Sequence, residues 1–264
     1  MTGAEEILNV LEEGEGRIGL DVGSRSAKAA FLRDGERIPL RCDTMELLEG
    51  IPSLHVSKEL EIVSCGYGRK RVPDAFSIPE IRAHATGVMK VLDIDDCTIL
   101  DIGGQDFKVI RMENRSIRDF TMNDKCAAGT GRFLEKMASM LSMSLEELGK
   151  HEGSVKVLES TCSVFTETEL ISLMMEGRGR DELASGVIHS VFERVRPYLR
   201  SFPADTLVFT GGVSRMKGLA RTISSNLDVE VMIPPDSQFT GAIGCLHSRS
   251  HHHHNGSSAG RTEG

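Results

Sequence analysis

Short apolar runs that end in glycine dominate the first part of the chain. Residues 17–33 form an apolar run, a glycine turn and a second, alternating run, and an Asp-Gly pair follows directly. Alternation with a period of two, bounded by glycine and Asp-Gly, predicts a β-hairpin. The run at 36–42 extends this hairpin as a third strand, and the run at 59–68 predicts another strand that ends at glycines.

The same order of elements recurs about eighty residues later. Residues 97–123 again give a strand, an Asp-x-Gly turn, a strand, a turn and a strand. In both units an aspartate ends the apolar strand, Asp21 before Gly23 and Asp101 before Gly103. Repetition of a supersecondary unit indicates an internal duplication. The pattern therefore predicts an α/β chain with two related lobes.

Helical spacing, with apolar residues three and four positions apart, prevails elsewhere. It predicts helices at 79–92, 129–141, 142–150, 165–177, 181–200, 215–227 and 239–248. Buried strands are predicted at 205–210 and 229–235, and the first of them runs into a pair of glycines.

These elements divide the chain into four segments. We expect an acidic leader at 1–16, a first α/β lobe at 17–95, a second α/β lobe at 96–248 and a disordered tail at 249–264. The tail contains four consecutive histidines, which are typical of a cloning remnant or of a solvated tail rather than of a metal site.

Composition excludes several classes of function. A net charge of -8, 5% aromatic residues and no tryptophan argue against nucleic acid as the main partner. No apolar run reaches the eighteen residues that a membrane span needs, and the acidic N-terminus lacks the pattern of a signal peptide. We therefore expect a cytoplasmic protein that uses neither nucleic acid nor membrane.

The strand-Asp-Gly turns have the chemistry of phosphate sites. Small hydroxyl residues, Ser24 and Ser26, follow the first turn, and turns of this kind present backbone N–H groups to an anion. An aspartate cannot approach phosphate without repulsion, but it can hold Mg²⁺ through water. A third turn, Gly211-Gly212, ends another buried strand and could admit the flat face of adenine or ribose.

Three such turns in this order resemble the superfamily of acetate and sugar kinases, heat-shock protein 70 and actin. The resemblance implies the actin/sugar-kinase/Hsp70-like fold, with two duplicated ribonuclease H-like lobes and ATP or ADP with Mg²⁺ in the cleft. It assigns the first phosphate loop to Asp21, Gly23, Ser24, Arg25, Ser26 and Lys28, the second to Asp101, Gly103, Gly104 and Gln105, and the adenosine loop to Gly211, Gly212 and Val213. On this assignment Asp21 and Asp101 organise Mg²⁺, and Gln105 positions the attacking water.

Two of the six cysteines have an unusual context. Cys126 precedes the glycine turn of Gly129 and Gly131 that opens a predicted helix, and Cys162 directly precedes another. The positive end of a helix dipole favours a thiolate and stabilises an anionic group. The simpler interpretation is that both are ordinary cysteines near helix caps. The other cysteines lack this context, and Cys97 and Cys245 lie in apolar segments that predict core positions.

The segments around these cysteines carry a closer resemblance. "NDKCAAGTGRF", "STCSVFTETE", "DIGGQD" and "GYGR" resemble the activator of 2-hydroxyacyl-CoA dehydratases, in the BadF/BadG/BcrA/BcrD type of ATPase. They also resemble the ATPase subunits of benzoyl-CoA reductases and the reductases of double-cubane cluster proteins. The resemblance implies one [4Fe–4S] cluster per homodimer, held by Cys126 and Cys162 of each chain. Four thiolates suit a cubane cluster, and a two-fold axis doubles two cysteines to four.

The resemblance also implies a function. ATP hydrolysis would drive a low-potential electron from ferredoxin or flavodoxin, through the cluster, into a partner iron–sulfur dehydratase or reductase. The glycines Gly129 and Gly131 after Cys126 could approach the nucleotide as well, and so link both sites. Two alternatives stay open: a small-molecule kinase of the same fold without a cluster, and an actin-like protein that polymerises.

Overall fold

The computed structural model describes residues 2–123, 130–154, 158 and 163–248. Its framework is a pair of five-stranded sheets. The first has the order β3-β2-β1-β4-β5, with β1 (Gly16–Val22), β2 (Ser26–Arg33), β3 (Glu36–Asp43), β4 (Leu60–Cys65) and β5 (Phe76–Ser77). The second has the order β10-β9-β6-β7-β8, with β6 (Cys97–Ile102), β7 (Phe107–Glu113), β8 (Ser116–Asn123), β9 (Thr206–Thr210) and β10 (Glu230–Met232).

The two sheets repeat one topology. In the first, β1 pairs antiparallel with β2 and parallel with β4. In the second, β6 pairs antiparallel with β7 and parallel with β9. The register repeats as well, because Asp21 faces Lys28 across the first hairpin and Asp101 faces Lys108 across the second. The duplication predicted from the two Asp-x-Gly turns is therefore present in the structure.

Helices α1 (Gly3–Glu13) and α2 (Thr44–Gly50) pack on the first sheet. The segment predicted as an acidic leader folds as α1, which starts with a capping box at Thr2. Its residues Ile7 and Leu11, four apart on one helix face, are fully buried in the core of this sheet. Burying two such side chains contributes roughly 3–6 kcal/mol, which explains why the leader is ordered.

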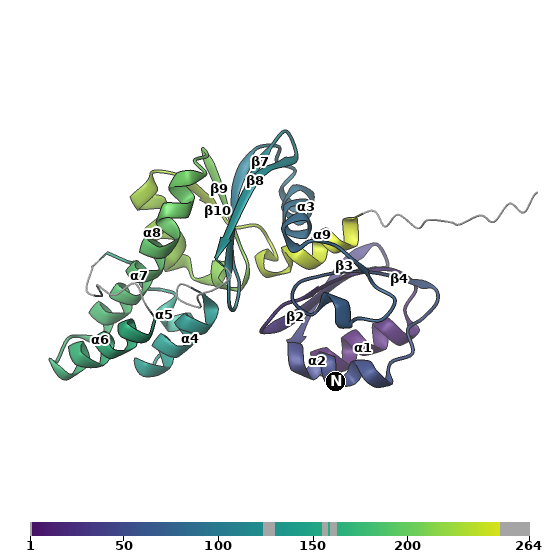
Figure 1. Cartoon of the computed structure of the whole chain (residues 1–264), viewed down its shortest axis with the longest axis horizontal. Helices are drawn as coiled ribbons and strands as arrows, with labels where there is room; N and C mark the ends of the chain where they lie inside the picture. The colour runs from purple at the N-terminus through teal and green to yellow at the C-terminus, as the bar shows by residue number, and fades with distance from the viewer. Residues whose placement is uncertain (1, 124–129, 155–157, 159–162, 249–264) are drawn as a thin grey trace, which may run out of the picture.

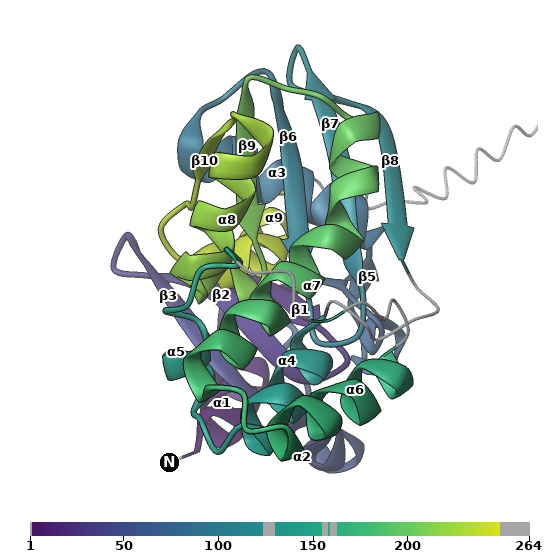
Figure 2. The same cartoon turned by 90° about the vertical axis from the view of Figure 1, so that its left-hand side faces the viewer.

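The second sheet is covered on both faces. One face packs on helices α4 (Gly131–Met140), α5 (Leu145–Leu148), α6 (Ser163–Met175), α7 (Arg180–Ser201) and α8 (Lys217–Leu227). Figure 2 shows the long helix α7 lying across this face. A helix is present in each of these predicted segments, but that predicted at 142–150 is shorter, because α5 begins after a capping box at Ser144 and ends at Leu148. Short 3-10 turns at Ile51–Ser53, Arg69–Arg71, Gly212–Arg215 and Ser237–Phe239 complete the described elements.

Helices α3 (Glu80–Leu92) and α9 (Thr240–His247) lie between the two halves (Figure 1). Their backbones touch, since a Cβ at Gly87 would lie 1.9 Å from the Thr240 carbonyl oxygen and one at Gly244 would lie 1.7 Å from that of Ala83. Only glycine permits so close an approach at these positions. We call this pair of helices the joint.

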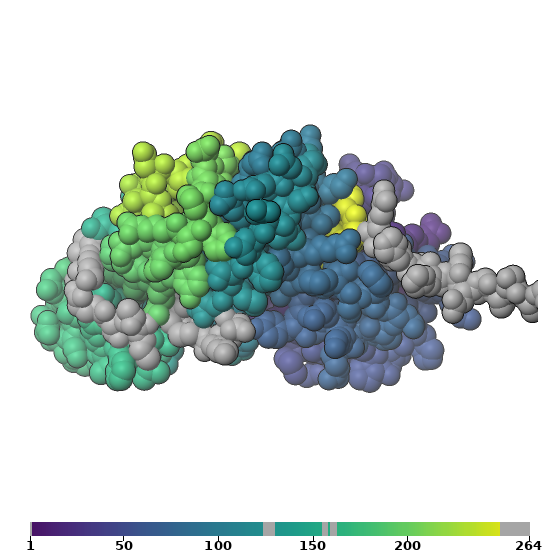
Figure 3. All heavy atoms as spheres, turned by 45° about the horizontal axis from the view of Figure 1, so that its top comes forward, coloured from purple at the N-terminus to yellow at the C-terminus, as the bar shows by residue number. Residues whose placement is uncertain are grey.

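The last helix returns the chain to its beginning. Helix α9 packs against β1, where a Cβ at Gly19 would lie 2.1 Å from the carbonyl oxygen of Ala242. In Figure 3 part of the yellow C-terminal segment is visible at the surface between atoms of the first third of the chain. Across the described ranges, no helix combines the length and apolar character required to cross a bilayer. The tail at 249–264 lies outside the described residues.

Candidate functional site

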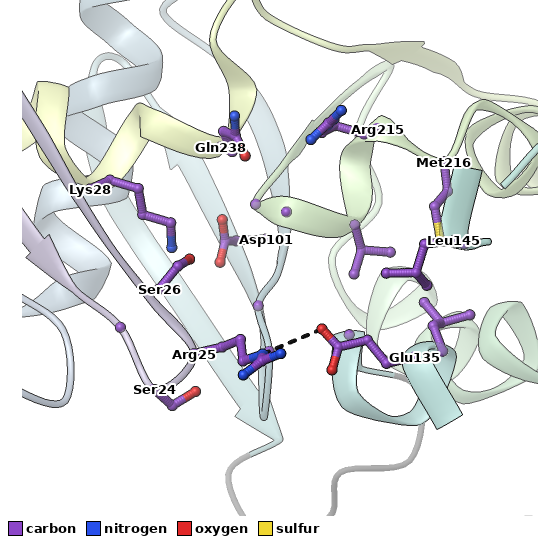
Figure 4. Close-up of a pocket in the computed structure, with 18 of the residues that line it drawn as sticks. Ser24, Arg25, Ser26, Lys28, Asp101, Glu135, Leu145, Arg215, Met216 and Gln238 are labelled. Carbon is purple, nitrogen blue, oxygen red and sulfur yellow. Dashed lines mark ion pairs between the residues drawn. The ribbon is translucent and has the colours of Figure 1, made fainter. Parts of the chain in front are cut away.

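A cavity of about 680 Å³ opens between the two sheets, and residues from both sheets line it. The turns that follow β1, β6 and β9 all reach this cavity, although they are far apart in sequence. Figure 4 shows Ser24, Arg25, Ser26 and Lys28 on one side of it and Asp101 in its centre. Strands β6 and β9 are parallel neighbours, so their carboxyl ends share one edge of the second sheet, and the turn after β1 reaches the cavity from the first sheet.

Nearly all of the described residues that the sequence assigned to the site line this cavity. They are Asp21, Gly23, Ser24, Arg25, Ser26, Lys28, Asp101, Gly103, Gly104, Gly131, Gly211, Gly212 and Val213. Gly129, Cys126 and Cys162 lie outside the described residues.

Gln105 is placed differently from the other assigned residues. It is not among the residues that line the cavity. With its amide oxygen turned toward Arg132, Gln105 accepts hydrogen bonds from that guanidinium at 3.2 and 3.3 Å. Its predicted role in positioning water therefore requires its amide to leave Arg132.

The first two loops are in direct contact. A Cβ at Gly104 would lie 2.9 Å from the Cβ of Arg25, so glycine is needed where the loops meet. The Arg25 guanidinium lies 3.5 Å from Glu135 of α4 and 3.6 Å from Asp43. The dashed line in Figure 4 marks the contact with Glu135, which spans the cavity from the first sheet to α4.

The first turn of α4 is hydrogen-bonded to the second loop. The backbone N–H groups of Gly131 and Arg132 donate to the carbonyl oxygens of Gly103 and Gly104, both at 2.9 Å. Donors at a helix start have no partner within the helix, so a neighbouring loop can take them up. A movement of this loop would therefore be transmitted directly to the start of α4.

One end of the cavity is apolar. Leu134 of α4, Leu145 of α5, Val213 and Met216 line it, and Gly211 beside them adopts a positive φ of 84°. An apolar slot next to a glycine turn can hold a flat aromatic base. No local pattern singles out Leu134, Leu145 or Met216, since apolar residues at helical spacing look like ordinary core positions until the tertiary structure is known.

One oxygen of the Asp101 carboxylate, Oδ2, has two close partners. Thr210 Oγ1 donates to Oδ2 at 2.8 Å, and His84 Nδ1 lies 3.1 Å from the same oxygen. Burial alone would raise the pKa of Asp101, but His84 and Lys108 outweigh it and hold that pKa well below its usual value. Asp101 is therefore an anion at neutral pH.

Lys108 is a buried cation behind Asp101. Its ammonium lies 2.9 Å from Glu80 and 2.9 Å from Asp106, and 3.9 Å from Asp101. Burial opposes the charge, but these carboxylates raise the pKa of Lys108 above its usual value. No local pattern in the sequence singles out Lys108, Glu80 or His84.

Asp21 is buried like Asp101, but only one of its two carboxylate oxygens has a partner among the described residues. Its Oδ2 lies 3.7 Å from the Lys28 ammonium. Its Oδ1 is buried and accepts no hydrogen bond from any described residue. A buried carboxylate oxygen without a donor is costly unless a ligand supplies one, and the waters of a hydrated Mg²⁺ are suitable donors. The site therefore fits a Mg²⁺–nucleotide complex.

A dedicated metal cage is absent from the part of the chain that the structure describes. No group of three or more His, Cys, Asp or Glu side chains there could hold a metal ion.

The four described cysteines, Cys42, Cys65, Cys97 and Cys245, are all buried. Burial raises the pKa of Cys42 and of Cys97 to about 11. A hydrogen bond with Cys245, together with burial, raises the pKa of Cys65. Buried thiols with raised pKa values are poor ligands and poor nucleophiles. The core positions predicted for Cys97 and Cys245 are confirmed.

Comparison with known proteins identifies similar chains. The model of the BadF/BadG/BcrA/BcrD ATPase family matches residues 54–246. The activator of lactoyl-CoA dehydratase from Anaerotignum propionicum is 38% identical over 247 residues, which cover 86% of this chain and 94% of that protein.

Two solved structures show the same arrangement. The activator of 2-hydroxyisocaproyl-CoA dehydratase from Clostridium difficile, with bound ADPNP, superposes with a TM-score of 0.76 at 34% identity and covers 87% of this chain and 92% of that one. A ROK family glucokinase from Streptomyces griseus has a TM-score of 0.53 at 12% identity, with 87% and 97% covered. The second likeness concerns the fold alone. The predicted actin/sugar-kinase/Hsp70-like fold is thus confirmed.

Proposed function

The chain belongs to the BadF/BadG/BcrA/BcrD ATPase family, and from this premise we propose that it is an ATP-driven electron-transfer activase. Its partner in this proposal is an iron–sulfur enzyme such as a 2-hydroxyacyl-CoA dehydratase, and its electron donor is a reduced ferredoxin or flavodoxin. The similarity to dehydratase activators over most of both chains supports the proposal.

One contact carries the coupling part of the proposal. The first turn of α4 is hydrogen-bonded to the second phosphate loop through Gly131 and Arg132. The same segment of chain leads back to Cys126, five residues before Gly131. A nucleotide that moves the loop would therefore move the first turn of α4, and a coupling of this kind needs only two positions of one element.

The cysteine inventory supports a shared cluster. In the proposal Cys126 and Cys162 of two chains provide the four thiolates of one [4Fe–4S] cluster. When bound, this cluster would supply a one-electron carrier at low potential. The four described cysteines are buried inside their own chain, and the pKa values of Cys42, Cys65 and Cys97 are raised, which makes them poor candidates for ligands shared between chains. Only Cys126 and Cys162 remain for the role.

The cavity residues have separate tasks in the ATPase reaction. We assign Asp21 and Asp101 to Mg²⁺ and its waters, and Arg25 and Lys28 to the charge of the phosphates. The apolar slot that includes Leu145 holds the base. Gln105 is assigned to the attacking water, a role that it takes up on release from Arg132.

The test is the double variant C126S/C162S, purified without oxygen beside C42A as the matched control. We expect the double variant to lose iron, sulfide and the cluster absorption, whereas C42A retains them, because Cys42 is a buried core thiol. A normal cluster spectrum in the double variant would refute the cluster assignment. Colourless wild-type protein that phosphorylates a small molecule would point to the kinase alternative.

A further inference from the structure

Helix α3 places one buried imidazole, His84, at the joint between the two sheets. The residue is 3% exposed, and its Nδ1 lies 3.1 Å from Asp101 Oδ2 and 3.2 Å from Thr240 Oγ1. The ionised Asp101 carboxylate can only accept, so Nδ1 carries the hydrogen and donates. Thr240 directs its own hydrogen to the Ser237 carbonyl oxygen at 3.3 Å, which leaves its oxygen free to accept. One edge of the ring is thus fixed to the second sheet and to α9.

The opposite edge of the ring faces the first sheet. A Cβ at Gly241 of α9 would lie 3.0 Å from Asp21 Oδ2 and 3.0 Å from His84 Nε2. Asp21 Oδ2 and His84 Nε2 therefore both lie next to the position that a side chain at Gly241 would occupy. His84 Nε2 is buried and makes no hydrogen bond with any described residue, and its nearest carboxylate on α3, Glu80, is 3.8 Å away. The imidazole stands between the aspartates of the two phosphate loops.

The surrounding backbone gives His84 no room to shift. Gly87 lies one helical turn after it on α3, at the contact with the Thr240 carbonyl, and Gly244 of α9 lies against the carbonyl of Ala83. Interiors packed at this density transmit displacement rather than absorb it. A change in the position of His84 would therefore change the position of Asp101 relative to Asp21.

We propose that His84 is a positioning residue for the ATPase reaction, which sets the spacing of Asp21 and Asp101. The inference rests on the proposed assignment of these aspartates to Mg²⁺ and its waters. Mg²⁺ demands near-ideal octahedral geometry, and like-charged carboxylates from two separate sheets drift apart unless a fixed group holds them. The His84 N–H group that donates to Asp101 lies on helix α3, which packs closely against α9, and so provides such a fixed group.

Two amide replacements separate positioning from simple packing. The amide nitrogen of Asn takes the place of Nδ1, so H84N keeps the donor toward Asp101. The amide nitrogen of Gln takes the place of Nε2, so H84Q loses that donor but retains volume and polarity. If His84 had only a structural role, H84N and H84Q would have the same activity, and only their thermal stability would be lowered.

The measurement is steady-state ATP hydrolysis across Mg²⁺ concentrations, with nucleotide binding by calorimetry. We expect H84Q to lower kcat about 10- to 100-fold, the loss typical of a misplacement near 1 Å, and to raise the Mg²⁺ concentration needed for half activity. The KM for MgATP at saturating Mg²⁺ and the affinity for ADP without Mg²⁺ stay within about threefold. H84N recovers most of kcat. Equal activity of H84Q and H84N, or a full kcat in H84Q, overturns the proposal.

A second variant tests the same geometry without altering the imidazole. G241A introduces a methyl group 3.0 Å from both Asp21 Oδ2 and His84 Nε2. The two side chains must therefore move away from the methyl group. G179A is the matched control, because a Cβ at Gly179 meets no atom within 4 Å. We expect G241A alone to lower kcat at least tenfold and to weaken the Mg²⁺-dependent part of ADP binding. If H84Q fails to fold, a folded G241A with normal kcat is sufficient to overturn the proposal.

The variant D101N separates this inference from the proposed function. A wild type that hydrolyses no ATP, or a fully active D101N, contradicts the proposed function itself. An inactive D101N beside a fully active H84Q contradicts only the role of His84.

Discussion

One duplicated position, occupied by Lys28 and Lys108, has acquired two environments. Both lysines face an aspartate across a hairpin, at the same register in the two sheets. The Lys28 side chain is 15% exposed and lines the cavity, whereas that of Lys108 is 1% exposed and is held by Glu80 and Asp106. The duplicated position thus holds one lysine that lines the cavity and one that is buried in the framework. The difference comes from α3, which brings Glu80 to the second hairpin.

The framework role of Lys108 predicts a large loss of stability in K108M. Removal of the ammonium leaves the buried Asp106 and the half-buried Glu80 without their cation, which costs about 3–5 kcal/mol. The pKa of Lys108 is raised on folding, so its contribution is complete below the usual lysine pKa and is lost only as pH rises toward the raised value. Urea unfolding should therefore show the same deficit at pH 7 and pH 9.

The control for this experiment is K58M, since Lys58 is exposed. A surface change of this kind alters the free energy of unfolding by no more than about 0.5 kcal/mol. A deficit in K108M as small as that in K58M would show that Lys108 is not part of the framework.

At the scale of elements, helix α4 contacts both the second phosphate loop and Arg25 of the first. Its first turn is hydrogen-bonded to the second phosphate loop, and its residue Glu135 reaches across the cavity to Arg25 of the first loop. An ion pair this exposed contributes little to stability by itself. Its place matters more than its energy, because a nucleotide phosphate would compete with Glu135 for the same guanidinium.

The contact across the cavity predicts a specific rescue. R25E puts a negative charge beside the phosphates and should weaken ADP binding at least tenfold. The double variant R25E/E135R restores the pair with reversed charges. We expect it to bind ADP about two- to fivefold more tightly than R25E, which corresponds to the roughly 0.4–1 kcal/mol typical of an exposed pair. Isothermal titration calorimetry measures both.

The matched control is R25E/E146R. Glu146 also lines the cavity, but its ion-pair partner is Lys150 at 3.6 Å. This control adds the same positive charge without rebuilding the contact with residue 25. Equal recovery in both double variants would mean that only net charge matters and that the pair across the cavity has no specific role.

At the scale of the whole molecule, the nucleotide cavity and the proposed cluster have different requirements. Both phosphate loops and the apolar slot that line the cavity are formed by residues of a single copy of the chain. The proposed cluster needs two chains, since each contributes only Cys126 and Cys162 in the proposal. The two functions should therefore separate when the cluster is removed.

Removal of the cluster by an iron chelator should convert the dimer to a monomer that still binds nucleotide. We expect light scattering to report half the mass, and the Kd for MgADP to change by less than about threefold. Wild-type protein kept without chelator is the control. A monomer that no longer binds MgADP would show that the second chain completes the cavity, and a dimer that persists without iron would show that the cluster does not hold the chains together.

Local patterns predicted the elements well. The Asp-x-Gly turns at Asp21 and Asp101 lie at strand ends, and the helix predicted at 79–92 is observed as α3 at Glu80–Leu92. Each signal depends on a few neighbouring residues, because turn and cap geometry is set by local sterics and hydrogen bonds. The residues that meet in the cavity could be grouped only through the resemblance to a known fold.

Patterns along the chain were sufficient to predict the two hairpins, the glycine turns and most helices, and they marked the unusual context of Cys126 and Cys162. The packing of distant segments alone brings α9 back to β1 and buries Lys108 behind Asp101. It also places His84 between the two aspartates. The reason is physical: strands, turns and caps follow from neighbours along the chain, whereas the environment of a buried charge is made by segments distant in sequence and has no local signature.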